Sequence, residues 1–178
     1  MGLEHYNSTR LKELIRDVPD FPKPGILFKD ITPILQTPDA FRAMIELLTD
    51  QLRSSSIDRL VAIESRGFLL GAPVAYALNR ALAIVRKPKK LPFHTKRVEY
   101  ALEYGKDALE IHADAIQAGE KVCIIDDVLA TGGTASATVE LVESLGAKVD
   151  SLLFLMELPF LKGREKLKRF QINSLMSF

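Results

Sequence analysis

The sequence has little that would support redox, metal or disulfide chemistry. Its 178 residues include a single cysteine, Cys123, so no disulfide can form within the chain. Because Cys123 lies in an apolar run, we expect a buried, unreactive thiol in a protein from a reducing compartment. The three histidines have no Cys or His neighbour at ligand spacing, which argues against a dedicated zinc site.

Long apolar runs and a strong net charge are also missing. No stretch is long enough to span a bilayer, and the first residues, MGLEHYNSTR, lack the apolar core of a signal peptide. The net charge of +1 gives no overall attraction to nucleic acid or an anionic membrane, and no serine lies in a G-x-S-x-G elbow. We therefore expect a cytoplasmic protein.

The composition is that of one globular domain, with 47% hydrophobic and 26% charged residues. Apolar spacing predicts a first helix over residues 8–18. The prolines of DFPKPGILFKDITPIL (20–35) predict an ordered but irregular segment. Thr37 and Pro38 then fit the start of a second helix.

From Ile57 onward, short apolar runs alternate with helical patterns. Strands are predicted over 57–63, 81–86, 121–126 and 147–157, and helices over 71–80 and 134–146. The final residues, FQINSLMSF, are predicted to form a last strand. Apolar strands separated by helices are typical of a Rossmann-like, mostly parallel α/β sheet with helices on both faces. Residues 87–106 are polar and predict a long loop.

The run CIIDDVLATGGTA carries the strongest functional signal. Asp126 and Asp127 follow a predicted strand, and ligands of parallel sheets bind beyond such strand ends. The loop ATGGT then leads into a helix, so its backbone amides can hold an anion. Each feature alone has a plain interpretation, as a solvated strand end or a tight turn. Together they suit a sugar phosphate, with the phosphate in the loop and vicinal hydroxyls on the carboxylates.

These residues resemble a motif of a known family. VCIIDDVLATGGTAS resembles the PRPP-binding signature of type I phosphoribosyltransferases, where PRPP is 5-phosphoribosyl 1-pyrophosphate. Further segments resemble adenine-specific members in the same order: DFPKPGILFKDITPIL, ESRGFLLGAP, VRKPKKLP, EYALEYGKDALEIHADAI and LKGREKL. The resemblance covers nearly the whole chain. It implies one domain over 1–178, with an N-terminal hood over about 1–36 and a core over about 37–178.

The resemblance also implies an activity: transfer of the phosphoribosyl group of PRPP to N9 of adenine, giving AMP and pyrophosphate in purine salvage. Asp126 and Asp127 would bind the ribose hydroxyls and stabilise the oxocarbenium-like centre. The 5′-phosphate would bind to Ala130, Thr131, Gly132, Gly133 and Thr134. Mg²⁺ would bind mainly through PRPP and pyrophosphate.

For the pyrophosphate, the resemblance implies Ser65 and Arg66, next to a cis peptide bond joining Glu64 and Ser65, and Arg86. A basic cluster over 86–97 could instead indicate nucleic acid, but Phe93 is its only aromatic residue. Pyrophosphate attraction and loop solvation account for the cluster. We therefore expect no nucleic-acid partner and no membrane.

The catalytic acid–base implied by the family is Glu103, which would exchange a proton with N7 of adenine. Glu99, in the same segment, is the competing assignment. Adenine would be bound by the backbone of Leu27 and Lys29 and by packing against Phe28 and Leu158, although core packing also explains these apolar residues.

Two other functions stay open at this point. The chain could be a sister transferase for another base, or a PRPP-sensing regulator. The hood segment and Glu103 argue against the first, and the chain has no room for the DNA-binding module expected of the second. The family is usually homodimeric, so a homodimer is expected.

Overall fold

The centre of the molecule is a sheet of five strands. The computed structural model describes residues 6–101 and 106–178. Within them the strand order is β4–β3–β7–β8–β9, and all neighbouring strands are parallel. The strands are β3 (Arg59–Ile63), β4 (Ala81–Val85), β7 (Lys121–Leu129), β8 (Lys148–Glu157) and β9 (Gln171–Ser177). The predicted parallel α/β fold is confirmed, and so is the last strand.

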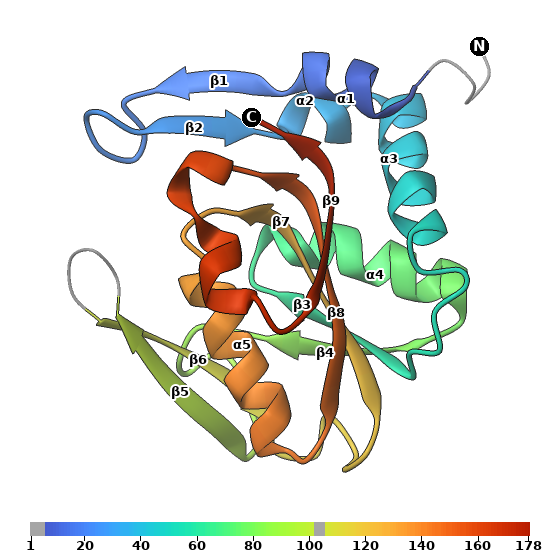
Figure 1. Ribbon diagram of the computed structural model, residues 1–178, viewed down its shortest axis with the longest axis vertical. Coiled ribbons are helices and arrows are strands. Elements are labelled where there is room, and N and C mark those ends of the chain that lie inside the picture. Colours follow the sequence, from blue (N-terminus) through green and yellow to red (C-terminus); the bar gives the residue numbers. More distant parts are fainter. Residues whose placement is uncertain (1–5, 102–105) are drawn as a thin grey trace.

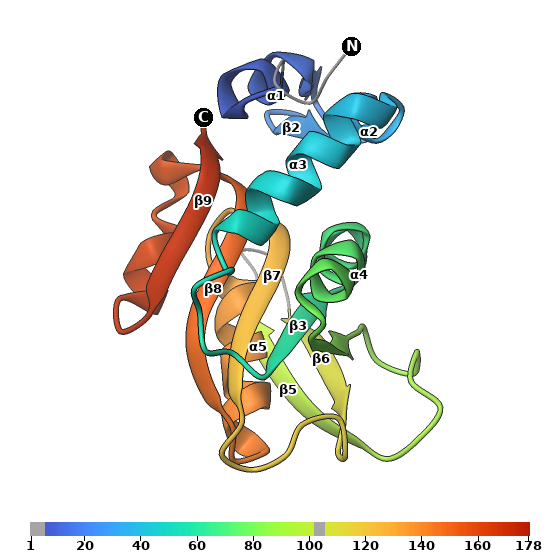
Figure 2. The same cartoon turned by 90° about the vertical axis from the view of Figure 1, so that its right-hand side faces the viewer.

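Both faces of the sheet are covered (Figures 1 and 2). Helices α1 (Ser8–Leu14), α3 (Pro38–Asp50) and α4 (Arg66–Leu78) belong to one core, while α5 (Gly133–Ser144) belongs to the other. Strand residues alternate between the cores: Leu60 and Ala62 of β3 join the first, Val61 and Ile63 the second. Burial on both faces explains why the strands read as continuous apolar runs.

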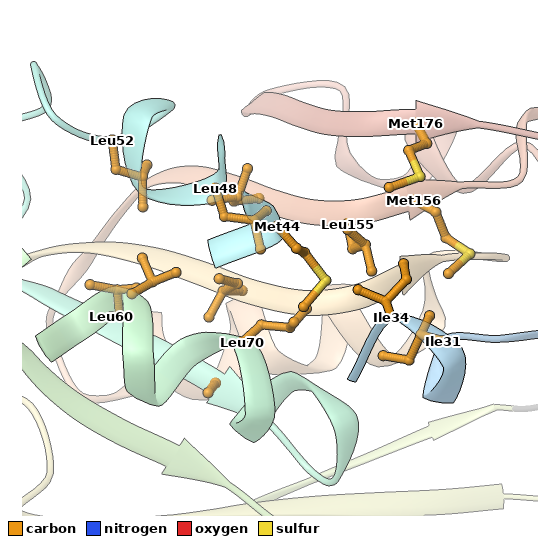
Figure 3. Packing of buried hydrophobic residues seen from close by; sticks show 14 of the residues in the cluster. Ile31, Ile34, Met44, Leu48, Leu52, Leu60, Leu70, Leu155, Met156 and Met176 are labelled. Atoms are coloured by element: carbon orange, nitrogen blue, oxygen red, sulfur yellow. The ribbon is translucent and has the colours of Figure 1, made fainter. Parts of the chain in front are cut away.

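The first core connects the N-terminal segment to the sheet. Figure 3 shows Met44 of α3 and Leu70 of α4 beside Leu155 of β8, with Ile31 and Ile34 at the same cluster's edge. Ile34 belongs to the short helix α2 (Thr32–Leu35). The N-terminal segment is therefore held by apolar burial, each such side chain contributing about 1.5–3 kcal/mol.

The N-terminal segment is more regular than predicted. The helix predicted over 8–18 ends at Leu14, and the chain enters β1 (Arg16–Pro19), which pairs antiparallel with β2 (Leu27–Asp30). Pro19 disfavours helical backbone at the preceding residue, which the apolar spacing did not take into account. Pro33 lies in the first turn of α2, where a missing N–H costs nothing.

The loop predicted over 87–106 is wrong in its second half. Strands β5 (Thr95–Ala101) and β6 (Lys106–His112) form an antiparallel hairpin that packs beside α5. Val98 is buried in the second core, whereas its neighbours Arg97 and Glu99 are exposed. This alternation is typical of a strand with one solvent-exposed face. The many charged residues on that face explain why the sequence pattern indicated a loop.

The helix predicted over 71–80 begins earlier, at Arg66. Pro73 therefore lies inside α4. The helix predicted over 134–146 is confirmed as α5, with Gly146 at φ 80° just beyond its end. The remaining elements are the 3-10 helices η2 (Pro159–Leu161) and η3 (Gly163–Leu167).

Cys123 is fully buried, and burial raises the pKa of its thiol to about 12. The predicted burial of Cys123 is therefore confirmed, and a raised pKa disfavours the reactive thiolate. In the two described ranges, 6–101 and 106–178, no helix has the length and apolar character needed to cross a membrane.

Candidate active site

A cavity of about 360 Å³ lies where the chain leaves β3 and β7 in opposite directions. These neighbouring strands are parallel; β3 leads into α4 on one face of the sheet, and β7 leads into α5 on the other. Such a divergence opens a crevice at the carboxyl ends of the strands. The cavity is lined by Glu64, Ser65, Arg66, Lys87 and the segment 126–135.

The acidic pair lies inside β7 and not after it. The strand runs on to Leu129, which corrects the prediction that it ends at Asp126. Pairing with β3 stops at Ile125, whereas pairing with β8 continues to Leu129. The acidic pair therefore lies just past the end of the β3–β7 pairing, where the cavity opens. Its backbone is still held by the pairing of β7 with β8.

The two carboxyl groups are in an unfavourable environment for negative charge. Burial and the neighbouring Asp127 carboxylate raise the pKa of Asp126 well above its usual value. Burial also raises the pKa of Asp127, although the Arg66 guanidinium opposes this. Asp126 Oδ1 accepts a hydrogen bond from the Asp127 N–H at 2.9 Å. Neighbouring carboxyl groups with raised pKa values in a cavity are typical of functional sites.

Arg66 partly neutralises this charge. Its Nε is 2.6 Å from Asp127 Oδ2, but the contact lacks hydrogen-bond geometry, and this buried oxygen has no hydrogen-bond partner in the described structure. The Arg66 guanidinium also lies 4.7 Å from the centre of the Phe28 ring, on β2. One side chain therefore touches both the acidic pair and the N-terminal hairpin.

The loop after β7 has the geometry of an anion site. Gly132 has φ 76°, a left-handed conformation that favours glycine, and α5 begins at the next residue. The first amide groups of a helix have no partner within it, so they can bind an anion in the cavity. A Cβ on Gly132 would lie 2.5 Å from the carbonyl oxygen of Gly163, so no side chain fits there.

The structure also places the predicted pyrophosphate ligands. Ser65 and Arg66 line the cavity, and the Glu64–Ser65 peptide bond is cis, as the family resemblance implies. Arg86 is not among the lining residues. Its guanidinium pairs with Glu64, with Nε 3.1 Å from Oε2, and holds the pKa of that carboxyl below its usual value against the opposing effect of burial.

Lys87 lines the cavity and was not singled out by the sequence analysis. Its ammonium contacts Asp107 and lies 3.2 Å from the Tyr100 hydroxyl. The Tyr100 hydroxyl is in turn 3.5 Å from Oγ1 of Thr134. The basic cluster over 86–97 signalled a cation here, but only the fold shows which of its members faces the cavity.

The predicted adenine-binding residues do not line this cavity. Leu27, Phe28 and Lys29 lie in β2, which among the described residues pairs only with β1. Leu158 precedes η2, and its N–H donates to the Leu129 carbonyl at 3.0 Å. In Figures 1 and 2 the β1–β2 hairpin lies beyond the end of β7, so it is next to the cavity end of the sheet.

Glu103, the predicted acid–base, lies outside the described residues. The competing residue, Glu99, lies in β5, and its carboxylate is 3.0 Å from Arg97 Nη2. Glu99 is exposed and does not line the cavity. Within the described parts of the chain, no cluster of three or more His, Cys, Asp or Glu side chains could hold a metal ion by itself.

Comparison with known proteins gives a consistent match. Residues 30–167 match the family model described as phosphoribosyl transferase domain. The chain is 55% identical over 168 residues to the adenine phosphoribosyltransferase of Caldanaerobacter subterraneus subsp. tengcongensis, covering 94% of this chain and 97% of that protein.

Solved structures agree with this match. The crystal structure of adenine phosphoribosyltransferase from Thermoanaerobacter pseudethanolicus has a TM-score of 0.95 and 53% identity, covering 97% of this chain and 100% of that one. The Saccharomyces cerevisiae enzyme, solved with an imino-altritol bisphosphate and adenine, has a TM-score of 0.88 and 43% identity, covering 94% and 97%. The chain belongs to the phosphoribosyltransferase family, among its adenine phosphoribosyltransferases.

Proposed function

We propose that this protein binds PRPP in the cavity and transfers its phosphoribosyl group to N9 of adenine, forming AMP and releasing pyrophosphate. The observation that carries the proposal is the acidic pair of β7 beside the glycine loop at the start of α5. The identity of 53–55% to adenine phosphoribosyltransferases supports adenine as the base. The product, AMP, places the reaction in purine salvage.

The ribose would bind with its diol on Asp126 and Asp127 and its 5′-phosphate in the loop from Ala130 to Thr134. The Asp127 oxygen that lacks a hydrogen-bond partner would accept from a ribose hydroxyl. As the C1′–oxygen bond to pyrophosphate breaks, positive charge develops on the ribose ring. The two carboxylates would stabilise this charge, since Asp127 is buried and Asp126 half-buried.

The pyrophosphate would bind on the other side of the acidic pair. Ser65 and Arg66 line that side of the cavity, with Lys87 as an additional cation. Arg66 would exchange its contact with Asp127 for the pyrophosphate oxygens when PRPP enters. Arg86 would contribute only if it left Glu64, so we assign it the weaker role.

The residues present are compatible with Mg²⁺ bound mainly through the substrate. Mg²⁺ commonly takes one or two carboxylates together with substrate phosphates and water. Asp126 and Asp127 would supply the carboxylates, and a separate protein-only metal site is not needed. When bound, the ion would neutralise the charge of the pyrophosphate leaving group.

Adenine would bind under the β1–β2 hairpin, the proposed hood. The free edge of β2 would offer the N–H and C=O of Leu27 and Lys29 to N1 and the exocyclic amine of adenine. Phe28 and Leu158 would pack against the ring. Glu103 would accept the proton of the imidazole ring at N7 while N9 attacks C1′.

We further propose a cytoplasmic homodimer, on the strength of the family resemblance.

The proposal on activity is tested by mixing the protein with adenine, PRPP and Mg²⁺ and measuring AMP and pyrophosphate. We expect both products in equal amounts, and much slower formation with Glu103→Gln.

The same assay separates the alternative functions. A PRPP-binding regulator would bind PRPP and form no AMP. A sister transferase would prefer hypoxanthine, guanine or another base in a panel of competing substrates. Either result would overturn the proposed activity.

A further inference from the structure

The segment LKGREKL was part of the family resemblance, yet no function has been assigned to it so far. In the structure it spans the end of η2 and all of η3, between β8 and β9. Its Gly163 contacts the loop from Ala130 to Thr134, called here the glycine loop. A Cβ on Gly163 would collide with the carbonyl oxygen of Ala130 and lie 3.0 Å from the Leu129 side chain.

The contact is made from both sides. A Cβ on Gly132 would lie 2.5 Å from the Gly163 carbonyl oxygen, so the two backbones meet with no room for a side chain on either. Gly132 and Ala130 belong to the loop that would hold the 5′-phosphate. The position of that loop therefore depends on where the backbone of Gly163 is held.

Arg164, the next residue, holds this backbone in place. Its guanidinium makes a two-pronged contact with Glu157 at the end of β8, with Nε 2.7 Å from Oε1 and Nη2 2.7 Å from Oε2. Its Nη1 donates to the Ile172 carbonyl at 3.1 Å, on β9. Because a planar guanidinium fits a carboxylate in a fixed orientation, this pair fixes the position of η3.

Glu157 is itself well fixed. It is only 7% exposed and also accepts a hydrogen bond from Ser174 Oγ at 3.2 Å. Arg164 lowers the pKa of Glu157, so the carboxylate stays charged at neutral pH. The adjacent Leu158 N–H donates to the Leu129 carbonyl, so Glu157 is connected to the strand that enters the loop.

We propose that Glu157 and Arg164 are positioning residues, which act through Gly163 to keep the glycine loop in the shape that binds a 5′-phosphate. This inference rests on the proposed binding of PRPP in the cavity. Neither the Glu157 nor the Arg164 side chain contacts the substrate in this proposal. Loss of the pair should weaken ligands that carry a 5′-phosphate and leave pyrophosphate binding nearly unchanged.

The test is the binding of ribose 5-phosphate and of pyrophosphate with Mg²⁺, measured separately by calorimetry, to wild type and Arg164→Met. We expect affinity for ribose 5-phosphate to fall about tenfold or more, because small displacements of a binding loop cost that much. Affinity for pyrophosphate should change less than about twofold. Arg164→Lys should recover part of the loss.

Arg169→Met is the matched control. Arg169, which follows η3, also pairs with a glutamate, Glu143 of α5, at 2.7 Å, but neither residue lines the cavity. It should bind both ligands as wild type does. Glu157→Gln provides a second test should Arg164→Met fail to fold, since the amide keeps the shape of the carboxylate and removes its charge.

The outcomes separate the two proposals. Equal affinities for ribose 5-phosphate in wild type and both variants would overturn the positioning role alone. A parallel loss for both ligands, scaling with lowered thermal stability, would also overturn it, since that indicates a merely structural pair. A wild-type protein that binds neither ligand would overturn the proposed function as well.

Discussion

At the scale of single residues, the cavity contains two carboxyl groups whose negative charges are poorly compensated. Asp127 is 3% exposed, and the cation that pairs with it within residues 6–101 and 106–178 is Arg66, whose guanidinium lacks hydrogen-bond geometry. Asp126 is next to it in the same strand, so a like charge adds to the effect of burial. This arrangement is unfavourable in the free protein and becomes favourable when a ligand brings hydroxyl donors and positive charge develops on its ribose ring.

Replacing Asp127 with asparagine tests the role of its charge. Asp127→Asn keeps the shape but removes the carboxylate that would stabilise the developing positive charge. We expect kcat/KM for PRPP to fall by about a hundredfold or more. The measurement is the initial rate of AMP formation, with the exposed Asp114→Asn as control. Near wild-type activity in Asp127→Asn would refute the assignment of the site.

The raised pKa of Asp126 predicts a pH-dependent stability. Its pKa is above the ordinary 3.8 in the folded state, so the folded chain keeps a proton that the unfolded chain has lost. The free energy of unfolding should therefore fall as pH rises from that value through the raised pKa. Asp126→Asn removes the ionisable group and should flatten this fall.

Thermal unfolding of the ligand-free protein at several pH values between about 5 and 8 measures the effect, because exposed carboxylates are already ionised there. We expect Asp126→Asn to melt at a higher temperature than wild type at the upper end of this range. Parallel curves for the two proteins would show that the folded-state pKa of Asp126 is not raised.

At the scale of elements, the glycine loop joins the end of β7 to the start of α5 and is supported by η3. Its shape depends on the left-handed backbone of Gly132 and on the space left by Gly163. The hydrogen bond from Ser136 N–H to the Gly132 carbonyl, at 2.9 Å, fixes the loop to the first turn of the helix. A phosphate can therefore be bound with little further ordering of the backbone.

Comparing Gly132→Ala with Gly119→Ala should separate the effect of backbone strain from the effect of a changed loop shape. A left-handed alanine costs about 1–2 kcal/mol at any such position. Gly119, at φ 88° with open space around it, is the matched control, because Gly119→Ala suffers the strain alone. We expect both variants to melt lower, but only Gly132→Ala to lose most of its affinity for ribose 5-phosphate. Equal affinities in a calorimetric titration would contradict this role of the loop.

At the scale of the whole molecule, two apolar cores hold the sheet from both faces, and the cavity opens where α4 and α5 leave it on opposite faces. The N-terminal hairpin is connected to this end by Ile31 and Ile34 in the first core and by Phe28 under Arg66. A ligand in the cavity would thus contact elements from both halves of the chain. Binding there should stabilise the fold as one unit.

Ribose 5-phosphate should therefore raise the melting temperature. At a concentration about 100 times Kd, linkage predicts about 2.7 kcal/mol of stabilisation. In a domain of this size that corresponds to a shift of roughly 5–10 °C. Thermal scans with increasing ligand measure the shift, which should be largely lost in Asp127→Asn. A melting temperature independent of ligand would argue against binding to the folded cavity.

Local sequence patterns were enough to predict the parallel sheet and the glycine turn after β7. Apolar runs such as KVCII mark buried strands, and the glycines of ATGGT mark a turn that close backbone contact requires. The family resemblance added the cis bond at Ser65, which no local pattern predicts. It also supplied the assignment of Glu103, which lies outside the described residues.

The contacts between charged residues, by contrast, could be found only from the fold. Arg66 and Asp127 are distant in the sequence yet in contact, and Lys87 lines the cavity while its neighbour Arg86 pairs with Glu64. Spacing along the chain carries no information on such pairs, because they depend on how strands are ordered in the sheet. The contact between Gly132 and Gly163 is of the same kind: each glycine reads as an ordinary turn residue until the fold brings their backbones together.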